Sequence, residues 1–160
     1  MSKEPISVGF CCLGNICRSP MAEAVFRHVV KTEGHIDKIK EIDSFGTGGW
    51  HEGESPDRRS SATCRKNGVS ISHKARKVTK DDFERFDYIL AMDEMNVNNL
   101  MQMRPKNSKA KVMLFGEFRR DQKLPKVVED PYYGGSDGFQ FNFEQIVDFS
   151  RGFIEKVLLA

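Results

Sequence analysis

The chain has 160 residues, of which 39% are hydrophobic and 30% charged, and its formal net charge at pH 7 is +2. This length and balance predict one soluble globular domain, residues 1–160, whose core needs neither disulfides nor a metal. The small net charge gives no reason to expect a nucleic acid or a membrane surface as partner.

The first residues, MSKEP, contain no apolar segment of the kind found in signal peptides, and no apolar run approaches the ~20 residues that span a bilayer. We therefore expect a cytoplasmic protein whose four cysteines are reduced. No Cys-x-x-Cys pair occurs, and the four histidines show no ligand spacing. The sequence thus predicts no metal site and no cofactor.

Strands and helices are predicted to alternate from the beginning of the chain. Residues 6–13 form an apolar run typical of a buried strand. Ser19 offers an N-cap and Pro20 suits the first turn of a helix, which we expect to end near Gly34. A second strand is predicted at 39–44.

The same alternation continues to the end of the chain. A second helix is expected between a start signal at Ser55-Pro56 and a stop signal at Asn67-Gly68. Residues 79–82 resemble a capping box before a short helix. The further predicted elements are a strand at 88–92, a helical stretch at 95–103, a strand at 111–115 and a long amphipathic helix at 143–157.

This order predicts an α/β fold in three layers. Continuously apolar strands indicate a central four-stranded, parallel, twisted sheet with helices on both faces. Ligands of such sheets bind beyond the carboxyl ends of the strands. Cys12, residues 44–50, Asp93 and the long loop 116–137 with Asp130 are all expected at that edge.

The segment FCCLGNICRSP at 10–20 carries the strongest chemical signal. Five residues separate Cys12 from Arg18, a loop short enough to wrap around an anion the size of phosphate. Gly14 and Asn15 tolerate left-handed backbone conformations, so successive amides can point inward beside a helix N-terminus. Arg18 adds a planar fork for two phosphate oxygens. The same donors would stabilise a thiolate at Cys12, which predicts a nucleophile aimed at phosphorus. No Gly-Lys-Ser/Thr follows, so this is not a nucleotide P-loop.

CLGNICRSP after a buried strand resembles the signature of the low-molecular-weight protein tyrosine phosphatases, also called low-molecular-weight acid phosphatases. DPYYGG at 130–135 resembles the acid loop of that family, and DSFGTGGWHEG, SHKAR and YILAMDEMN lie between the two in the expected order. The resemblance covers essentially the whole chain. It implies a metal-independent phosphatase that hydrolyses phosphotyrosine in proteins, and small aryl phosphates, through a phosphocysteine intermediate.

The resemblance also implies a role for each matching residue. Cys12 would attack the phosphoester, Arg18 and the loop amides would hold the oxygens, and Asp130 would protonate the leaving phenolate. Substrate and phosphate binding would fall to Leu13, Gly14, Asn15, Ile16, Cys17, Ser19, Trp50, Tyr132 and Tyr133. Ser19 would also contact the Cys12 sulfur, and Trp50, Tyr132 and Tyr133 would form the aromatic rim of a crevice. Ser44, His73 and Asp93 would support the loop.

Simpler interpretations stand beside these. Cys11 is expected in the core, facing away from Cys12, and Cys64 is expected to pack on a helix. Cys17 could fill the inner side of the loop, or protect Cys12 through a reversible disulfide. Asp130 before Pro131 could be a turn former, and Trp50, taken alone, could be a core residue.

Other functions also remain open. An arsenate reductase of similar fold would need more cysteines downstream than Cys64. Phosphatases acting on phosphoarginine or small phosphoesters are closer rivals, and a phosphotyrosine-binding module without turnover is a third alternative. The expected partners are phosphotyrosine proteins or aryl phosphates, with inorganic phosphate or a similar oxyanion in the loop and the protein a monomer or weak dimer. Tyr132 and Tyr133, beside acidic residues, could themselves be phosphorylated.

Overall fold

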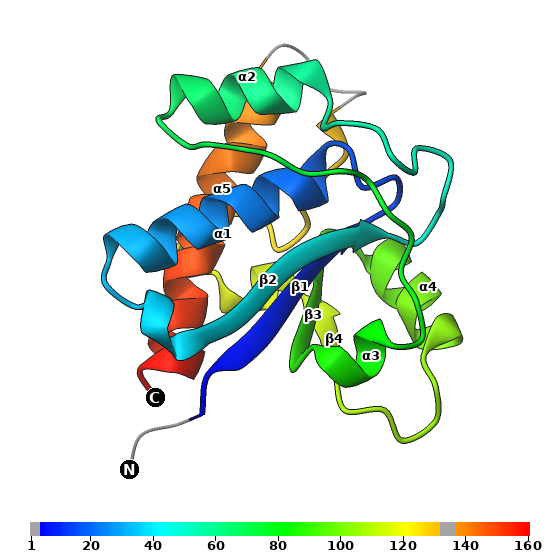
Figure 1. The fold of residues 1–160 in the computed structure, drawn as a ribbon. Helices are drawn as coiled ribbons and strands as arrows, with labels where there is room; N and C mark the ends of the chain where they lie inside the picture. The colour runs from blue at the N-terminus through cyan, green and yellow to red at the C-terminus, as the bar shows by residue number, and fades with distance from the viewer. Residues whose placement is uncertain (1–3, 132–136) are drawn as a thin grey trace.

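The computed structural model describes residues 4–131 and 137–160, in which strands and helices alternate (Figure 1). The strands are β1 (Ile6–Cys12), β2 (Ile39–Gly46), β3 (Tyr88–Ala91) and β4 (Lys111–Leu114). The α-helices are α1 (Arg18–Thr32), α2 (Arg58–Lys66), α3 (Asp82–Arg85), α4 (Glu94–Met103) and α5 (Gly138–Phe153). The described residues also include the short 3-10 helices η1 (Ile36–Lys38) and η2 (Phe115–Phe118) and the π-helical turn η4 (Ile154–Leu158).

The four strands form one parallel sheet in the order β2-β1-β3-β4. The predicted α/β fold with a four-stranded parallel sheet is therefore confirmed. Strand β1 lies inside the sheet and pairs with β2 on one side and β3 on the other. Its carboxyl end, and everything that follows it, consequently lies at the middle of one edge of the sheet.

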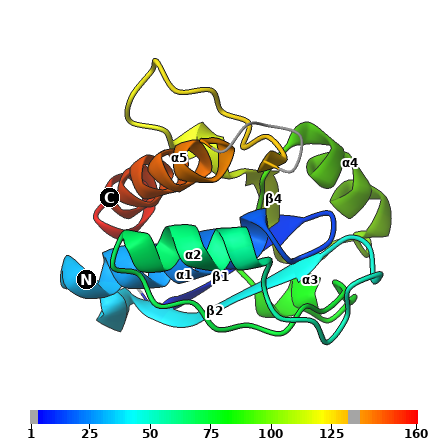
Figure 2. The ribbon, with the colours of Figure 1, turned by 90° about the horizontal axis from the view of Figure 1, so that it is seen from above.

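Side chains along β1 alternate between two hydrophobic clusters, as the period of two in a strand requires. Val8, Phe10 and Cys12 belong to the cluster that α1, α2 and α5 cover. Cys11 faces the opposite cluster, which α3 and α4 cover, and it is fully buried. The prediction that Cys11 is a core residue turned away from Cys12 is confirmed. Figure 2 shows α2, α1 and α5 side by side on their face of the sheet.

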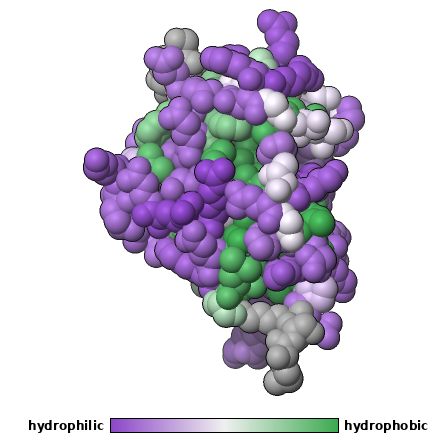
Figure 3. Space-filling view, turned by 90° about the vertical axis from the view of Figure 1, so that its left-hand side faces the viewer, coloured by the Kyte–Doolittle hydropathy of each residue, from purple (hydrophilic) through white to green (hydrophobic). Residues whose placement is uncertain are grey.

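Packed aromatic rings dominate the larger cluster. The ring of Phe10 lies with its centroid 5.3 Å from that of Phe26 and 5.0 Å from that of Phe115. On the face that Figure 3 shows, hydrophilic side chains cover most of the surface and hydrophobic ones form narrow patches. None of the helices in residues 4–131 and 137–160 is long and apolar enough to cross a bilayer.

The predicted helix starts need correction at three places. Helix α1 starts at Arg18 without a side-chain cap, because the Ser19 hydroxyl lies 3.0 Å from the Cys12 sulfur instead of capping the helix. Helix α2 starts after Asp57, which accepts a hydrogen bond from Arg59, and not at Ser55. The stop signal at Asn67-Gly68 is confirmed by the left-handed φ of +78° at the glycine.

The third correction concerns residues 79–82, where no reciprocal capping box forms. The carboxylate of Asp82 accepts hydrogen bonds from the backbone and the hydroxyl of Thr79, but the N-cap residue of α3 is Asp81, which caps nothing. A reciprocal box instead opens α4, where the Asp93 carboxylate accepts from the Asn96 backbone and the Asn96 side chain accepts from the Asp93 backbone. The fold therefore fixes Asp93 firmly at the carboxyl end of β3.

Candidate active site

The predicted site residues that the structure describes come together at the carboxyl edge of the sheet. Cys12 is the last residue of β1, and α1 begins at Arg18, so the segment between them forms a tight loop above the strand. We call residues 12–18 the phosphate loop. Gly46, at the end of β2, approaches this loop so closely that a Cβ there would lie 2.7 Å from the Leu13 carbonyl oxygen. The loop therefore rests directly on the neighbouring strand.

The Cys12 sulfur lies between two hydrogen-bonding groups and is nearly buried. The Asn15 backbone N–H donates to Sγ at 3.3 Å, and the Ser19 hydroxyl lies 3.0 Å away. Since that hydroxyl already accepts a hydrogen bond from the Asn15 side chain, its own proton is available for the sulfur. Cys12 is 3% exposed, so these donors act on a sulfur largely shielded from water. The arrangement thus directs two hydrogen-bonding groups at Sγ.

Asn15 fixes the shape of the phosphate loop. Its φ of +59° lies in the left-handed region, which asparagine tolerates better than most residues. Its Nδ2 donates to the hydroxyls of Ser19 and Ser44, and its Oδ1 accepts from the Arg76 backbone at 3.0 Å and from His73 at 2.7 Å. These four contacts use the whole hydrogen-bonding capacity of the amide. The conformation that the sequence predicted for Asn15 is thus held from four directions.

His73 and Ser44 brace Asn15 from behind, and both contact Glu23. The Ser44 hydroxyl donates to Glu23 Oε1 at 2.7 Å, and His73 Nδ1 lies 3.2 Å from the same oxygen. His73 Nε2 also contacts Asn15 Oδ1, the side-chain oxygen. Because this oxygen only accepts hydrogen bonds, Nε2 carries the proton and donates it. Glu23 is 5% exposed, so helix α1 places a buried carboxylate behind the loop that it follows. The predicted bracing residues are in contact, through a residue that the sequence did not single out.

Arg18 is held from two sides. Its Nη1 donates to Asp93 Oδ2 at 2.6 Å and to the Val128 carbonyl oxygen at 3.0 Å. Burial disfavours the guanidinium charge, but Cys12 and the hydrogen bond and charge of Asp93 outweigh it and raise the pKa of Arg18. A permanently charged, oriented guanidinium therefore lies beside the cysteine.

Asp130 lies close enough to the phosphate loop to act on its charges. Its carboxylate helps to raise the pKa of both Arg18 and Cys17. For Cys17 burial is the larger cause, and its pKa rises to about 12. Val128, two residues before Asp130, also donates its backbone N–H to the Met92 carbonyl at the end of β3. The segment with Asp130 is thus attached to the site at Val128, whereas Tyr132 and Tyr133 lie outside the described residues.

The remaining predicted residues lie at the mouth of the loop. Leu13 is 37% exposed and Trp50 is 72% exposed, so Trp50 is not a core residue. Gly14 and Ile16 are partly buried, and the Ile16 carbonyl oxygen accepts from the Asp57 backbone. Trp50 follows β2 and lines a crevice together with Leu13, and its role in an aromatic rim stays a prediction.

Three residues that sequence reasoning missed also shape the site. Glu23 holds the bracing pair, and Arg76 supplies the backbone donor that orients Asn15. Gln145, fully buried on α5, donates to the carbonyl oxygens of Pro125 and Val127 at 3.1 and 3.0 Å. For Glu23 and Gln145 the available signal was a charged or amide residue on the apolar stripe of a helix, which is costly to bury without partners; Arg76 lies in a loop and left no such signal.

One group in the described residues has the composition of a metal site. Ligand atoms of Glu23, Asp43 and His73 lie within 4.8 Å of one another. In this structure His73 Nδ1 is 3.2 Å from Glu23 and 3.9 Å from Asp43, so the imidazole itself sits between the two carboxylates. The three residues thus form a polar cluster that supports the phosphate loop from behind.

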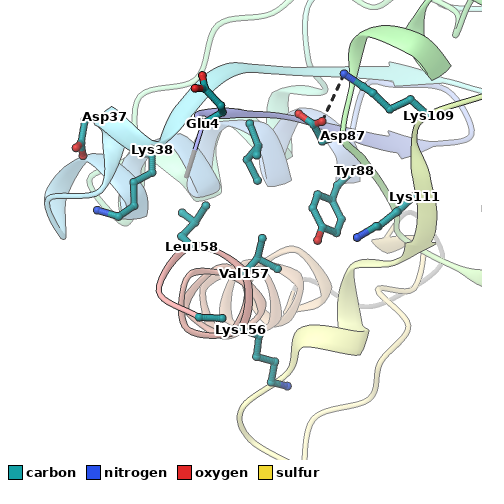
Figure 4. Close-up of a pocket in the computed structure, with 12 residues that line it drawn as sticks. Glu4, Asp37, Lys38, Asp87, Tyr88, Lys109, Lys111, Lys156, Val157 and Leu158 are labelled. Carbon is teal, nitrogen blue, oxygen red and sulfur yellow. Dashed lines mark ion pairs between the residues drawn. The ribbon is translucent and has the colours of Figure 1, made fainter. Parts of the chain in front are cut away.

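A cavity of about 780 Å³ lies at the opposite edge of the sheet, away from the phosphate loop. Figure 4 shows Val157, Leu158 and Tyr88 around it, with Lys109 paired to Asp87. Among the described residues, none of the predicted site residues lines it. Size alone would favour this cavity, but the nucleophile, the guanidinium and the carboxylates all gather at the carboxyl edge. We therefore take the phosphate loop, and not this cavity, as the candidate active site.

A parallel α/β sheet whose first crossover carries a cysteine and an arginine around an anion-sized loop defines a class of phosphate-handling enzymes. The sequence model described as "Low molecular weight phosphotyrosine protein phosphatase" matches residues 7–158 of this chain. A protein of that name from Schizosaccharomyces pombe is 52% identical over 152 residues, covering 95% of this chain and 97% of the relative.

Solved structures of phosphatases superpose on this chain over almost its whole length. A protein tyrosine phosphatase from Entamoeba histolytica superposes with a TM-score of 0.90 at 36% identity, covering 96% of this chain and 97% of that one. A drosophila arginine phosphatase superposes with a TM-score of 0.83 at 30% identity, covering 94% and 96%. The chain belongs to the low molecular weight phosphotyrosine protein phosphatase family, and the resemblance predicted from its motifs is confirmed. The protein is accordingly an enzyme, a protein tyrosine phosphatase.

Proposed function

We propose that the protein hydrolyses phosphotyrosine, in proteins and in small aryl phosphates, with Cys12 as nucleophile. The sulfur attacks phosphorus in line with the ester oxygen, so that a P–S bond forms as the P–O bond to the phenol breaks. The observation that carries this proposal is the nearly buried Cys12 sulfur, which lies between the backbone N–H of Asn15 and the hydroxyl of Ser19. Both groups stabilise the thiolate before attack and the sulfur when it leaves.

Arg18 and Asp130 have the two other roles in the reaction, which are binding of the phosphoryl oxygens and proton transfer. Arg18, oriented by Asp93 and the Val128 carbonyl, binds the equatorial oxygens of the phosphoryl group and stabilises the charge of the transition state. Asp130 donates its proton to the phenolate oxygen as that oxygen leaves. The deprotonated Asp130 then takes a proton from the water that attacks phosphorus. This second step breaks the P–S bond and releases inorganic phosphate, with no metal involved.

The rim of the site favours aryl phosphates through reach. Cys12 is recessed at 3% exposure, whereas Trp50 projects with 72% of its surface exposed. A flat phenyl ring beside Trp50 can extend a phosphate down to the sulfur, and the shorter arm of phosphoserine would fall short. The specificity for phosphotyrosine follows from this difference in depth.

The experiment measures hydrolysis of p-nitrophenyl phosphate in the presence of EDTA. We expect activity in the wild type, and in Cys12→Ser we expect retained phosphate binding with no turnover. Cys11→Ala serves as the matched control, because Cys11 is equally buried but faces the other side of the sheet. Asp130→Ala should retain slow turnover, with the largest loss on substrates whose leaving groups are poor. Full turnover by Cys12→Ser would refute the nucleophile.

Phosphoarginine is the second candidate substrate, because the drosophila arginine phosphatase superposes over 94% of this chain. Paired peptides with phosphotyrosine or phosphoarginine at the same position would separate the two specificities by kcat/KM. An arsenate reductase relay is disfavoured because Cys64 is fully buried in the core. Cytoplasmic location, a monomeric or weakly dimeric state and a Cys12–Cys17 disulfide stay predictions.

A further inference from the structure

A crevice of about 250 Å³ opens beside the phosphate loop, on the side of α4. Its walls come from the loop, from the segment after β2 and from the last turns of α4, and they include Leu13, Thr47, Trp50, Asn99, Gln102 and Met103. Figure 1 shows α4 and the segment after β2 on the same side of the molecule. Since Leu13 directly follows Cys12, the crevice adjoins the place where the phosphate must sit.

The walls of the crevice are uncharged and of two kinds. Leu13, Trp50 and Met103 supply apolar surface, while Asn99 and Gln102 supply amides that both donate and accept hydrogen bonds. A carboxylate or ammonium group entering this crevice would lose water and meet no opposite charge among the lining residues. The crevice therefore selects against charged groups.

Thr47 supplies an independent sign that a polar partner belongs here. It is 6% exposed, its backbone N–H is bonded to the Cys12 carbonyl oxygen, and its hydroxyl has no partner among the residues that the structure describes. A buried hydroxyl without a hydrogen bond is unfavourable by about 1–3 kcal/mol. We infer that a turn about the Cα–Cβ bond to another staggered position brings the hydroxyl to a ligand in the crevice.

The volume limits what can enter. Sites for whole small-molecule ligands measure about 300–1,000 Å³, and liquid water occupies about 30 Å³ per molecule. At about 250 Å³ the crevice is below that range and suits a single amino-acid side chain. A side chain beside the phosphotyrosine is in the right place to fill it, because the tyrosine ring itself occupies the neighbouring slot over Cys12.

We propose that this crevice binds an uncharged, amide-bearing side chain, glutamine or asparagine, of a residue that flanks phosphotyrosine in a protein substrate. The aliphatic stem packs on Leu13, Trp50 and Met103, and the amide bonds with Thr47, Asn99 and Gln102. This inference rests on the proposed phosphotyrosine phosphatase function and adds the sequence context that the enzyme prefers.

The test uses one phosphotyrosine peptide with glutamine, glutamate, leucine or alanine placed in turn at the two positions on each side of the phosphotyrosine. We expect kcat/KM at one of these positions to be about 5- to 10-fold higher for glutamine than for glutamate or leucine. This ratio corresponds to the contribution of one hydrogen bond to binding. Glutamate and leucine match glutamine in size, so the comparison isolates charge and hydrogen bonding.

Variants of the enzyme assign the preference to the crevice. Thr47→Val keeps the shape and the backbone hydrogen bond, and Asn99→Leu removes one amide; both should reduce the glutamine-to-leucine ratio toward one. Asn98→Leu is the matched control, since Asn98 is exposed on the same helix and does not line the crevice, and it should retain the wild-type ratio.

The outcomes separate this inference from the proposed function. No hydrolysis of p-nitrophenyl phosphate by the wild type would refute the phosphatase function itself. Normal hydrolysis with no glutamine preference at any of the four positions would overturn the crevice alone. A preference that survives both Thr47→Val and Asn99→Leu would overturn it equally.

Discussion

Replacing Gln145 by methionine tests whether α5 positions Asp130, the proposed general acid. Gln145 is fully buried, and its amide donates to the carbonyl oxygens of Pro125 and Val127. The next residue, Val128, accepts from Arg18, and Asp130 follows two residues later. Methionine keeps the length of the side chain but has no N–H donor, so it would free this segment without opening a cavity.

The magnitude follows from the two lost bonds. Each contributes about 0.5–1.5 kcal/mol, so the free energy of unfolding should fall by about 1–3 kcal/mol. The loss is reduced because Gln145 Oε1 has no hydrogen-bond partner, and the methionine removes that unpaired oxygen too. The melting temperature should fall by about 2–4 °C per kcal/mol in a chain of this size. Misplacement of the acid by about 1 Å should lower kcat roughly 10- to 100-fold where protonation of the leaving group is essential.

The assay compares p-nitrophenyl phosphate with phenyl phosphate, whose leaving group is the poorer one. The loss of kcat/KM in Gln145→Met should be clearly larger for phenyl phosphate, because only that substrate depends strongly on the acid. Ser150→Ala is the matched control: Ser150 lies on the same helix, is fully buried, and its hydroxyl also has no partner among the described residues. If Gln145→Met lowered both activities equally, or neither, the positioning role would be wrong.

Three further predictions concern stability and reactivity. Burial alone would raise the pKa of Asp82, but hydrogen bonds from Arg76 outweigh it and hold that pKa below its ordinary 3.8. A depressed pKa stabilises the fold above about pH 3.8 and loses this contribution as the pH falls further, so Asp82→Asn should flatten the acid side of a urea-unfolding series against pH. Gly116→Ala should lower the free energy of unfolding by about 1–3 kcal/mol or more, because its Cβ would lie 1.9 Å from the Lys126 carbonyl oxygen; an unchanged urea midpoint would contradict this. Cys17, with a pKa raised to about 12, should resist iodoacetamide at pH 7, and rapid labelling located by mass spectrometry would disprove the burial argument.

The sequence predicted the parts of the fold and site that depend on local order. Apolar runs placed all four strands, and the spacing from Cys12 to Arg18 indicated the anion loop. Contacts between distant segments were outside its reach. Arg76 contacts Asn15, which is 61 positions away in the sequence, and Gln145 contacts Val127, which is 18 positions away. Contacts between such distant residues produce no periodic pattern in the sequence that could predict them.

Ser19 shows how a functional contact can override a local preference. A serine before Pro20 at the start of a helix predicts an N-cap, since its hydroxyl would satisfy a free backbone N–H. The structure uses this hydroxyl at the Cys12 sulfur and leaves the helix without a side-chain cap. The uncapped N–H groups remain available to an anion in the loop, so the failed prediction itself points to the site.

The network behind the phosphate loop explains how Asn15 holds the loop in the shape that the structure shows. Asn15 takes a left-handed conformation, and all four hydrogen-bonding positions of its side chain are filled by Ser19, Ser44, His73 and the Arg76 backbone. Glycine would adopt the same backbone conformation at less cost, so the conformation alone does not require asparagine. What glycine lacks is the amide that links the hydroxyl beside the sulfur to the buried residues behind the loop. We therefore expect the donors to be in place before phosphate arrives, so that little binding energy is spent on ordering them.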